Sequence, residues 1–138
     1  MRKTIALALV SLCFVACSKD KDSDVNKENI SGSYKVTAAT MQAGSAAPID
    51  YLALQSPCEK DDIIKLNSDL TYNYVDAGTK CSPVGDDSGV WSVPSNTQIS
   101  IDGQVSTIKS FDGHTLVISD TELIGSVNYV SVTTLVKQ

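Results

Sequence analysis

Apolar and polar residues alternate in short segments from about residue 30 to the end of the chain. Tyr34, Val36 and Ala38 share one side of the first segment, residues 31–38, and polar residues occupy the other side. A period of two residues is typical of a half-buried β-strand. Similar segments cover residues 63–66, 70–74, 89–93, 98–102, 105–110, 114–119 and 127–136. Residues 49–55 lie between two prolines and predict one or two helical turns.

Tight turns separate these segments. Asp102-Gly103 is a strong signal for a two-residue hairpin turn, and Asp112-Gly113 repeats it. About eight strands joined in this way predict a single all-β domain in an up-and-down meander. Pairing of the first strand with the last would remove both exposed edges and close an antiparallel β-barrel. Such a barrel is filled by side chains or holds one small ligand. A sandwich of two sheets is the alternative.

The N-terminus has the pattern of a secretory signal peptide over residues 1–16. A basic head precedes an apolar run at residues 5–16, which is too short to span a bilayer permanently. The run ends in Val15-Ala16-Cys17, with Leu12 and Phe14 upstream. This ending resembles the lipobox of bacterial lipoproteins and implies cleavage before Cys17 and its lipidation by acyl chains such as palmitate. The alternative is a soluble secreted protein in which Cys17 is a free thiol.

Two further cysteines, Cys58 and Cys81, bracket a predicted hairpin. Its arms are residues 63–66 and 70–74, and Asn67-Ser68-Asp69 has the chemistry of a turn. Antiparallel pairing of the arms brings both sulfurs to the open end of the hairpin, in a chain whose export favours disulfides. We therefore predict a disulfide, which would add roughly 3 kcal/mol of stability in the chain-entropy model. Redox-active or metal-binding thiols would require a nearby partner or a Cys-x-x-Cys spacing.

Residues 17–29 are almost entirely polar and predict a flexible tether before a folded domain at residues 30–138. Ser18, in place of Asp after the cysteine, resembles the pattern of lipoproteins that are passed to the outer membrane. The alternating Lys and Asp residues at 19–24 resemble the export signals of some surface lipoproteins. We expect a lipid anchor in the outer membrane, and both a periplasmic and a cell-surface orientation remain open.

The chain is acidic, with a formal net charge of −5. Loss of Arg2 and Lys3 with the signal peptide, without loss of any acid, takes the mature charge to −7. An acidic protein has no electrostatic basis for binding nucleic acid or anionic head groups. The lipid on Cys17 must therefore supply the membrane attachment, and we expect a monomer.

The order of several short motifs resembles that of the bacterial lipocalin-like lipoproteins. These motifs are Ile30-Ser31-Gly32-Ser33-Tyr34-Lys35-Val36, with Tyr34 where lipocalins have Trp, then Cys58-Glu59-Lys60-Asp61-Asp62, Leu70-Thr71-Tyr72, Cys81 and Gly89-Val90-Trp91. The resemblance spans residues 30–138. It implies a lipocalin-like β-barrel of about eight strands with a short helical segment, and it specifies the fold more closely than any ligand.

Residues with catalytic or metal-binding chemistry are few. His114 is the one histidine, follows a hairpin glycine and has no Cys or His partner at ligand spacing, which favours a solvated turn residue. Asp61-Asp62 is expected at the entry to a strand, where neighbouring side chains point to opposite faces, and Asp86-Asp87 lies in a polar loop. We therefore predict no enzyme activity, no metal and no cofactor.

Aromatic residues are the candidates for recognition. Tyr72 and Tyr74 share one strand face and Trp91 begins a neighbouring strand, so all three could line the barrel mouth or pack in its core. Our first hypothesis is a non-enzymatic lipoprotein that binds a small hydrophobic ligand or a cell-envelope molecule. The alternative is a surface module that binds a protein or glycan through its loops, and the third is a hydrolytic or isomerising barrel enzyme.

Overall fold

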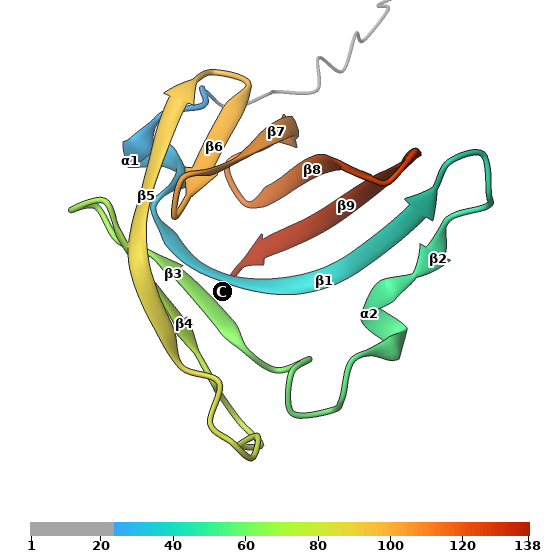
Figure 1. Ribbon diagram of the computed structural model, residues 1–138. Coiled ribbons are helices and arrows are strands. Elements are labelled where there is room, and N and C mark those ends of the chain that lie inside the picture. Colours follow the sequence, from blue (N-terminus) through green and yellow to red (C-terminus); the bar gives the residue numbers. More distant parts are fainter. Residues whose placement is uncertain (1–23) are drawn as a thin grey trace, which may run out of the picture.

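The structure is a computed structural model that describes residues 24–138. The described chain forms two short helices and nine strands (Figure 1). They are α1 (Lys27–Ile30), β1 (Gly32–Ala43), β2 (Ile49–Asp50), α2 (Tyr51–Leu54), β3 (Ile63–Leu66), β4 (Thr71–Val75), β5 (Asp87–Ser95), β6 (Gln98–Ile101), β7 (Gln104–Phe111), β8 (Thr115–Ile124) and β9 (Val127–Lys137). Neither helix is long and apolar enough to cross a membrane.

Eight of the strands close into an antiparallel up-and-down barrel. Each of β3 to β9 pairs with its neighbour in the sequence, and β1 joins β3 on one side and β9 on the other. The closing pair is long, from Tyr34 opposite Lys137 to Ala43 opposite Tyr129. The predicted meander and its closure are confirmed, so the alternative of a two-sheet sandwich is wrong.

Strand β1 is shared unequally between its neighbours. Its first residues, Gly32 to Lys35, pair with β3, whereas Thr40 and Met41 pair with the two-residue strand β2. The short helix α2 follows β2, and the Asp50 carboxylate accepts a hydrogen bond from the Ala53 amide at its first turn. The barrel wall between β1 and β3 is therefore completed by α2 at one end.

A β-bulge changes the alternation within β1. The register against β9 shifts between Val36 and Ala38, so that Ala39 is buried and Ala38 is exposed. A bulge inserts one residue and moves the following side chains to the opposite face. The expectation that Ala38 shares the face of Tyr34 is therefore wrong.

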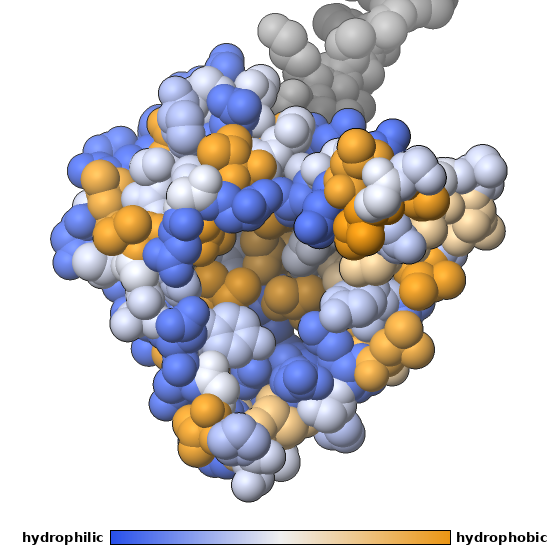
Figure 2. All heavy atoms as spheres, viewed as in Figure 1, coloured by the Kyte–Doolittle hydropathy of each residue, from blue (hydrophilic) through white to orange (hydrophobic). Residues whose placement is uncertain are grey.

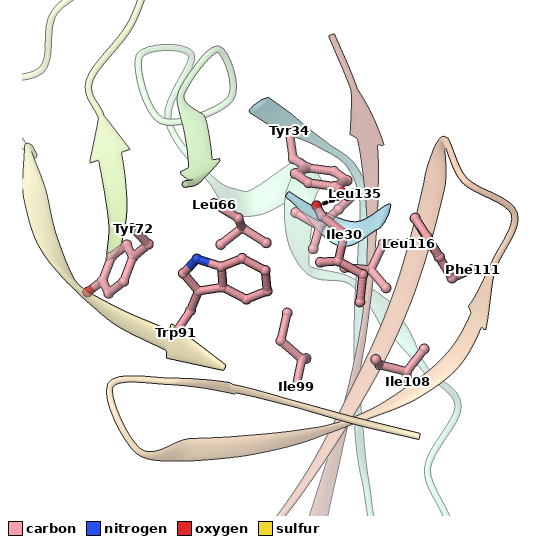
Figure 3. Packing of buried hydrophobic residues seen from close by; sticks show 10 residues of the cluster. All are labelled: Ile30, Tyr34, Leu66, Tyr72, Trp91, Ile99, Ile108, Phe111, Leu116 and Leu135. Atoms are coloured by element: carbon pink, nitrogen blue, oxygen red, sulfur yellow. Dashed lines mark hydrogen bonds between the residues drawn. The ribbon is translucent and has the colours of Figure 1, made fainter. Parts of the chain in front are cut away.

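One end of the barrel is closed and tightly packed (Figure 3). Ile30, at the end of α1, is fully buried. The Tyr34 hydroxyl donates a hydrogen bond of 2.6 Å to the carbonyl of Ile30. Trp91 lies in the middle of the cluster, and its Nε1 donates to the Asn67 carbonyl at 2.9 Å. The core consists of Ile30, Tyr34, Leu66, Tyr72, Trp91, Ile99, Ile108, Phe111, Leu116 and Leu135.

Ordered structure begins before residue 30. The side chain of Asn26 accepts the Asn29 amide and caps α1, and Val25 packs against the core. Ile30, the last residue of this helix, is part of the core. Residues 24–29, the last part of the predicted tether, are therefore part of the described fold. The predicted signal peptide, Cys17 and the first residues of the tether lie outside the described residues.

The predicted disulfide is present at the opposite end of the barrel. Cys58 and Cys81 are bonded, with their Cα atoms 5.3 Å apart. The hairpin of β3 and β4 has the expected register, with Leu66 opposite Tyr72 and Ile64 opposite Tyr74. The buried carboxylate of Asp76 accepts hydrogen bonds from the amides of Cys81 and Gly85 and orders the loop that carries the second sulfur.

The two Asp-Gly turns differ. Asp102 has a φ of 49° and Gly103 a φ of 80°, as expected for a two-residue turn between β6 and β7. At the other site the Asp112 carboxylate instead accepts the amides of both His114 and Thr115. The loop between β7 and β8 is therefore longer than a two-residue turn, because the aspartate side chain supplies the hydrogen bonds that close it.

Candidate ligand-binding lumen

The inner face of the barrel changes character along its axis. On β8 the inward row runs from Leu116 in the core through Ile118 to Asp120 and Glu122. The facing row on β9 runs from Leu135 through Thr133 and Ser131 to Tyr129. Side chains two residues apart share one face of a strand. The lumen is therefore apolar at the end closed by α1 and increasingly polar toward the mouth.

A first pocket of about 200 Å³ lies where α2 completes the wall. Its apolar side comes from β1 and β3, and its polar side comes from the residues around the disulfide loop. It is lined by Val36, Ala39, Tyr51, Gln55, Glu59, Asp62, Ile64, Tyr74 and Thr133. Apolar walls with a few convergent polar groups are typical of small-molecule sites.

A second pocket of about 640 Å³ lies beside the disulfide. Its lining is Ser56, Cys58, Glu59, Asp62, Tyr74, Cys81, Ser82, Pro83 and Gly85. Glu59, Asp62 and Tyr74 also line the first pocket, so the two pockets are neighbours across these three side chains. Figure 2 shows a hollow in this face of the molecule, with apolar residues deep inside and hydrophilic residues around it.

Tyr74 is the aromatic residue common to both pockets. Burial raises the pKa of its phenol, and a hydrogen bond with Asp62 and the negative charges of Asp62, Glu59 and Asp76 raise it further. The hydroxyl is therefore protonated at any physiological pH. Tyr74 presents an apolar ring and a neutral hydrogen-bonding group at the pocket wall.

Tyr72 is oriented differently. Its ring is buried in the core, and its hydroxyl donates to Asp102 Oδ2 at 2.7 Å and to Asp87 Oδ2 at 3.0 Å. The hydrogen bond to Asp102 is the main reason that the pKa of Tyr72 is raised, followed by burial and by Asp87. The same hydrogen bond lowers the pKa of Asp102, together with the Val90 amide. This cluster holds the β4, β5 and β6 segments together.

The three predicted recognition residues therefore separate in space. Tyr74 lies at the wall of the lumen pockets, whereas Tyr72 and Trp91 belong to the packed core at the closed end. Their strand assignments could be made from the alternation, but the depth of each side chain depends on where the barrel closes. Contact of Tyr74 with a ligand remains a prediction.

The acidic residues also have distinct positions. Asp62 is buried and faces the pockets, whereas Asp61 lies in the turn before β3 and accepts the Thr79 amide. Asp86 accepts the Asp76 amide in the disulfide loop, and His114 is exposed in the β7–β8 loop. Within residues 24–138, the structure contains no group of three or more metal-ligating side chains.

Several lumen residues were not singled out from the sequence. They are Glu59, Asp120, Glu122 and Tyr129. Asp120 and Glu122 are separated from Leu116 by four and six residues, so a period of two places both carboxylates on the same strand face as this leucine. This spacing is the sequence signal for their position in the lumen. The predicted strand ends at residue 119 and leaves both acids outside it, whereas β8 continues to Ile124.

An eight-stranded up-and-down barrel with one packed end and pockets inside its other end belongs to the class of barrels that hold small ligands. The comparisons with known proteins agree with that class. The sequence profile of the lipocalin-like domain matches residues 20–123, and the chain belongs to this family. The match ends within β8, so β9, which closes the barrel, lies beyond it. No curated protein and no solved structure gave a match.

Proposed function

We propose that this protein is a non-enzymatic lipoprotein whose barrel binds a small, largely hydrophobic ligand or cell-envelope molecule in the mouth half of its lumen. The observation that supports this most directly is the pocket of about 200 Å³ between β1, β3 and α2. Val36, Ala39 and Ile64 give it an apolar wall, and Tyr74 adds a hydrogen-bonding group. Membership in the lipocalin-like family fits a small-ligand role.

The construction of both ends of the barrel supports the proposal of a small-ligand site. The closed end has an apolar core with satisfied hydrogen bonds at Tyr34 and Trp91. The mouth is bordered by α2, the disulfide loops and the β8–β9 hairpin (Figure 1). A preformed, stapled pocket reduces the entropy that a ligand must lose on binding.

The proposal includes an anchor in the outer membrane through a lipid on Cys17. Its support is the lipobox-like ending of the apolar run at residues 5–16 and the polar residues that follow. The described chain begins at residue 24 beside α1, at the closed end of the barrel. A lipid on Cys17 would therefore be connected to the fold at the end of the barrel that α1 closes.

Native mass spectrometry of the full-length protein, purified from its own envelope, tests the ligand. We expect a bound mass in the parent and its loss in Ala39→Leu, since Ala39 is buried at the pocket wall. Ala38→Leu is the matched control, because its side chain is exposed on the outside of the same strand. A bound mass that survives Ala39→Leu, or no bound mass at all, would contradict binding at this pocket.

Fractionation tests the anchor. Cys17→Ala should move the protein from the membrane pellet to the soluble fraction, because the proposed lipid on Cys17 is what attaches the acidic mature chain to the bilayer. A mutant that stays in the pellet would refute lipid anchoring at this residue.

A second candidate function is docking of a protein or glycan on the mouth loops. It is favoured by large apolar side chains exposed there, at Leu54 on α2 and at Leu123 and Ile124 on the β8–β9 hairpin. An empty barrel in native mass spectrometry would favour this function over ligand binding.

A further inference from the structure

The two pockets described above differ in chemistry, although three side chains line both of them. We call them the α2 pocket, of about 200 Å³, and the disulfide pocket, of about 640 Å³. Val36, Ala39 and Ile64 line the α2 pocket alone, whereas the hydroxyl side chains Ser56 and Ser82 line the disulfide pocket alone. A ligand that occupies both pockets therefore meets hydrocarbon at one end and hydrogen-bonding groups at the other.

The α2 pocket is an apolar space inside the barrel. Val36 and Ile64 pack against the core cluster. Ala39 is buried on the inner side of β1, opposite Thr133 of β9. Because the alanine side chain is small, the wall leaves room at this position. A hydrocarbon chain in the α2 pocket exchanges water for apolar neighbours, which is favourable.

The side chains that both pockets share mainly accept hydrogen bonds. Asp62 is 7% exposed, accepts the Ala77 amide at 3.1 Å and is hydrogen bonded to Tyr74. Oε2 of Glu59 accepts both the amide and the hydroxyl of Ser56 at 2.8 Å. An ionised carboxylate has about four acceptor sites, so each acid can accept further hydrogen bonds. A complementary ligand therefore donates several hydrogen bonds.

The charge around the two pockets excludes an anionic ligand. Among residues 24–138, no Lys, Arg or His lines either pocket. Two lysines adjoin lining residues in the sequence, and both bind backbone carbonyls. Nζ of Lys60 donates to the Ala53 carbonyl at 3.1 Å, and Nζ of Lys80 donates to the Asp76 carbonyl. A carboxylate or phosphate head group would therefore lie against two acids without a compensating cation, which is unfavourable.

The hydrogen bonds of the two acids favour a neutral head group over a cationic one. Glu59 and Asp62 already accept hydrogen bonds from the protein, and within the described part of the chain neither has a buried oxygen without a partner. These carboxylates therefore do not require a counterion. The acceptors are spread around a pocket of about 640 Å³, to which Ser82 adds a hydroxyl. Several acceptors in one large pocket match a head group with several hydroxyls better than a single ammonium.

We infer that the two pockets together bind a neutral amphiphile with a sugar head group, such as an alkyl glycoside or a glycolipid. Its hydrocarbon chain occupies the α2 pocket, and its sugar occupies the disulfide pocket. Glu59 and Asp62 accept hydrogen bonds from the sugar hydroxyls, while Tyr74 and Pro83 contact its C–H groups. The inference rests on the proposed function and narrows its ligand from any hydrophobic molecule to one with a neutral, polyhydroxylated head group.

Calorimetric titration of the full-length lipidated protein in phosphatidylcholine nanodiscs tests this inference, with empty nanodiscs as the blank. Sugar detergents are avoided because they resemble the ligand. Hexyl β-glucoside, hexan-1-ol, hexanoate and hexylamine share one chain length, and glucose lacks the chain. We expect hexyl glucoside to bind at least about tenfold more tightly than hexan-1-ol, hexylamine or glucose. We expect no measurable binding of hexanoate.

One pair of variants tests the hydrocarbon end of the site. Ala39→Leu fills the α2 pocket and should weaken the binding of hexyl glucoside and hexan-1-ol alike. Ala38→Leu, exposed on the same strand, should bind both probes as the parent does.

A second pair of variants tests the sugar end. Gly85 lines the disulfide pocket and its φ is not positive. Among the described residues, no atom lies within 4 Å of the Cβ position that a side chain there would take. Gly85→Leu should therefore weaken hexyl glucoside at least about tenfold and leave hexan-1-ol unchanged. Val84→Leu changes the exposed neighbour outside both linings and should bind both probes as the parent does.

The possible failures are distinguishable. Equal affinity of hexyl glucoside and hexan-1-ol would overturn the sugar site and leave the lumen-binding function standing. Tighter binding of hexylamine would overturn the neutral head group, and binding of hexanoate would overturn the exclusion of anions. Equal losses in Val84→Leu and Gly85→Leu would overturn the position of the sugar. Failure of all five probes would overturn the sugar amphiphile, while native mass spectrometry judges the lumen-binding function separately.

Discussion

The two ends of this barrel are built from the same strands but differ in nearly every physical property. At the closed end, Ile30, Trp91 and Leu116 are almost fully buried, and the polar groups among them are hydrogen bonded. At the mouth, the continuation of β8 carries Asp120 and Glu122 into a pocket, and one carboxylate oxygen there is buried without a partner. The comparison shows that the closed end contains the apolar core, whereas the pockets and the carboxylates that line them lie at the mouth.

The largest expected effect concerns the closed end. Trp91→Ala should lower the free energy of unfolding by about 4 kcal/mol, since it removes the largest core side chain and leaves the Asn67 carbonyl without its donor. Denaturant unfolding monitored by circular dichroism measures the loss. The matched mouth variant Tyr74→Ala should lose clearly less. Equal losses would mean that the two ends are equally important for stability.

The disulfide is the main stabilising feature of the mouth. Cys58→Ser/Cys81→Ser should lose about 3 kcal/mol, because the bond closes a loop with a sequence separation of 23. Thermal unfolding of parent and variant, with and without reductant, measures this. The reductant should lower the melting temperature of the parent and leave that of the variant unchanged. Equal melting of both proteins under oxidising conditions would refute the role of the bond.

Removal of a charge from the lumen should raise the stability of the protein, in contrast to the two variants above. Asp120→Asn should raise the stability of the ligand-free protein by about 0.5 kcal/mol, since it relieves repulsion from Glu122 on the same strand face. It also replaces a carboxylate that has one oxygen buried without a hydrogen-bond partner by a neutral amide. Chemical denaturation after removal of bound ligand measures the gain. A loss of stability would show that Asp120 is structural.

The smallest expected effect is a change in the melting temperature of Asp102→Asn at acid pH. The pKa of Asp102 is lowered by hydrogen bonds from Tyr72 and then from the Val90 amide. A folded-state pKa below the unfolded value of about 3.9 stabilises the protein above that pH, and this stability is lost as the pH falls through the folded pKa. Asp102→Asn should therefore reduce the loss of melting temperature between pH 5 and pH 3. An unchanged acid slope would contradict the assignment.

Local sequence patterns predicted the strands, the barrel class and the disulfide because each depends on neighbours in the chain. The alternation at Tyr72 and Tyr74, the Asp102-Gly103 turn and the cysteines around the β3–β4 hairpin all have local causes. The face assignment of β1 failed after Val36, because a bulge depends on the register with β9, about a hundred residues away.

The candidate site was harder to predict than the fold. Val130, Val132 and Val136 form the most regular apolar row of the last strand, yet the pockets and core use the intervening Tyr129, Ser131 and Leu135. Both rows of β9 have a period of two, and the alternation alone does not say which one faces inward. The short polar α1 was likewise not recognisable as the element that closes one end.

The amino-acid sequence by itself determined that the chain alternates with a period of two, turns at glycines and joins Cys58 to Cys81. These features follow from backbone sterics and short-range pairing. Only the tertiary structure decided that Trp91 is core, that Tyr74 lines a pocket and that Oδ1 of Asp120 is buried without a hydrogen-bond partner. The depth of a side chain in a closed barrel depends on the register of every strand around it, and no single segment contains that information.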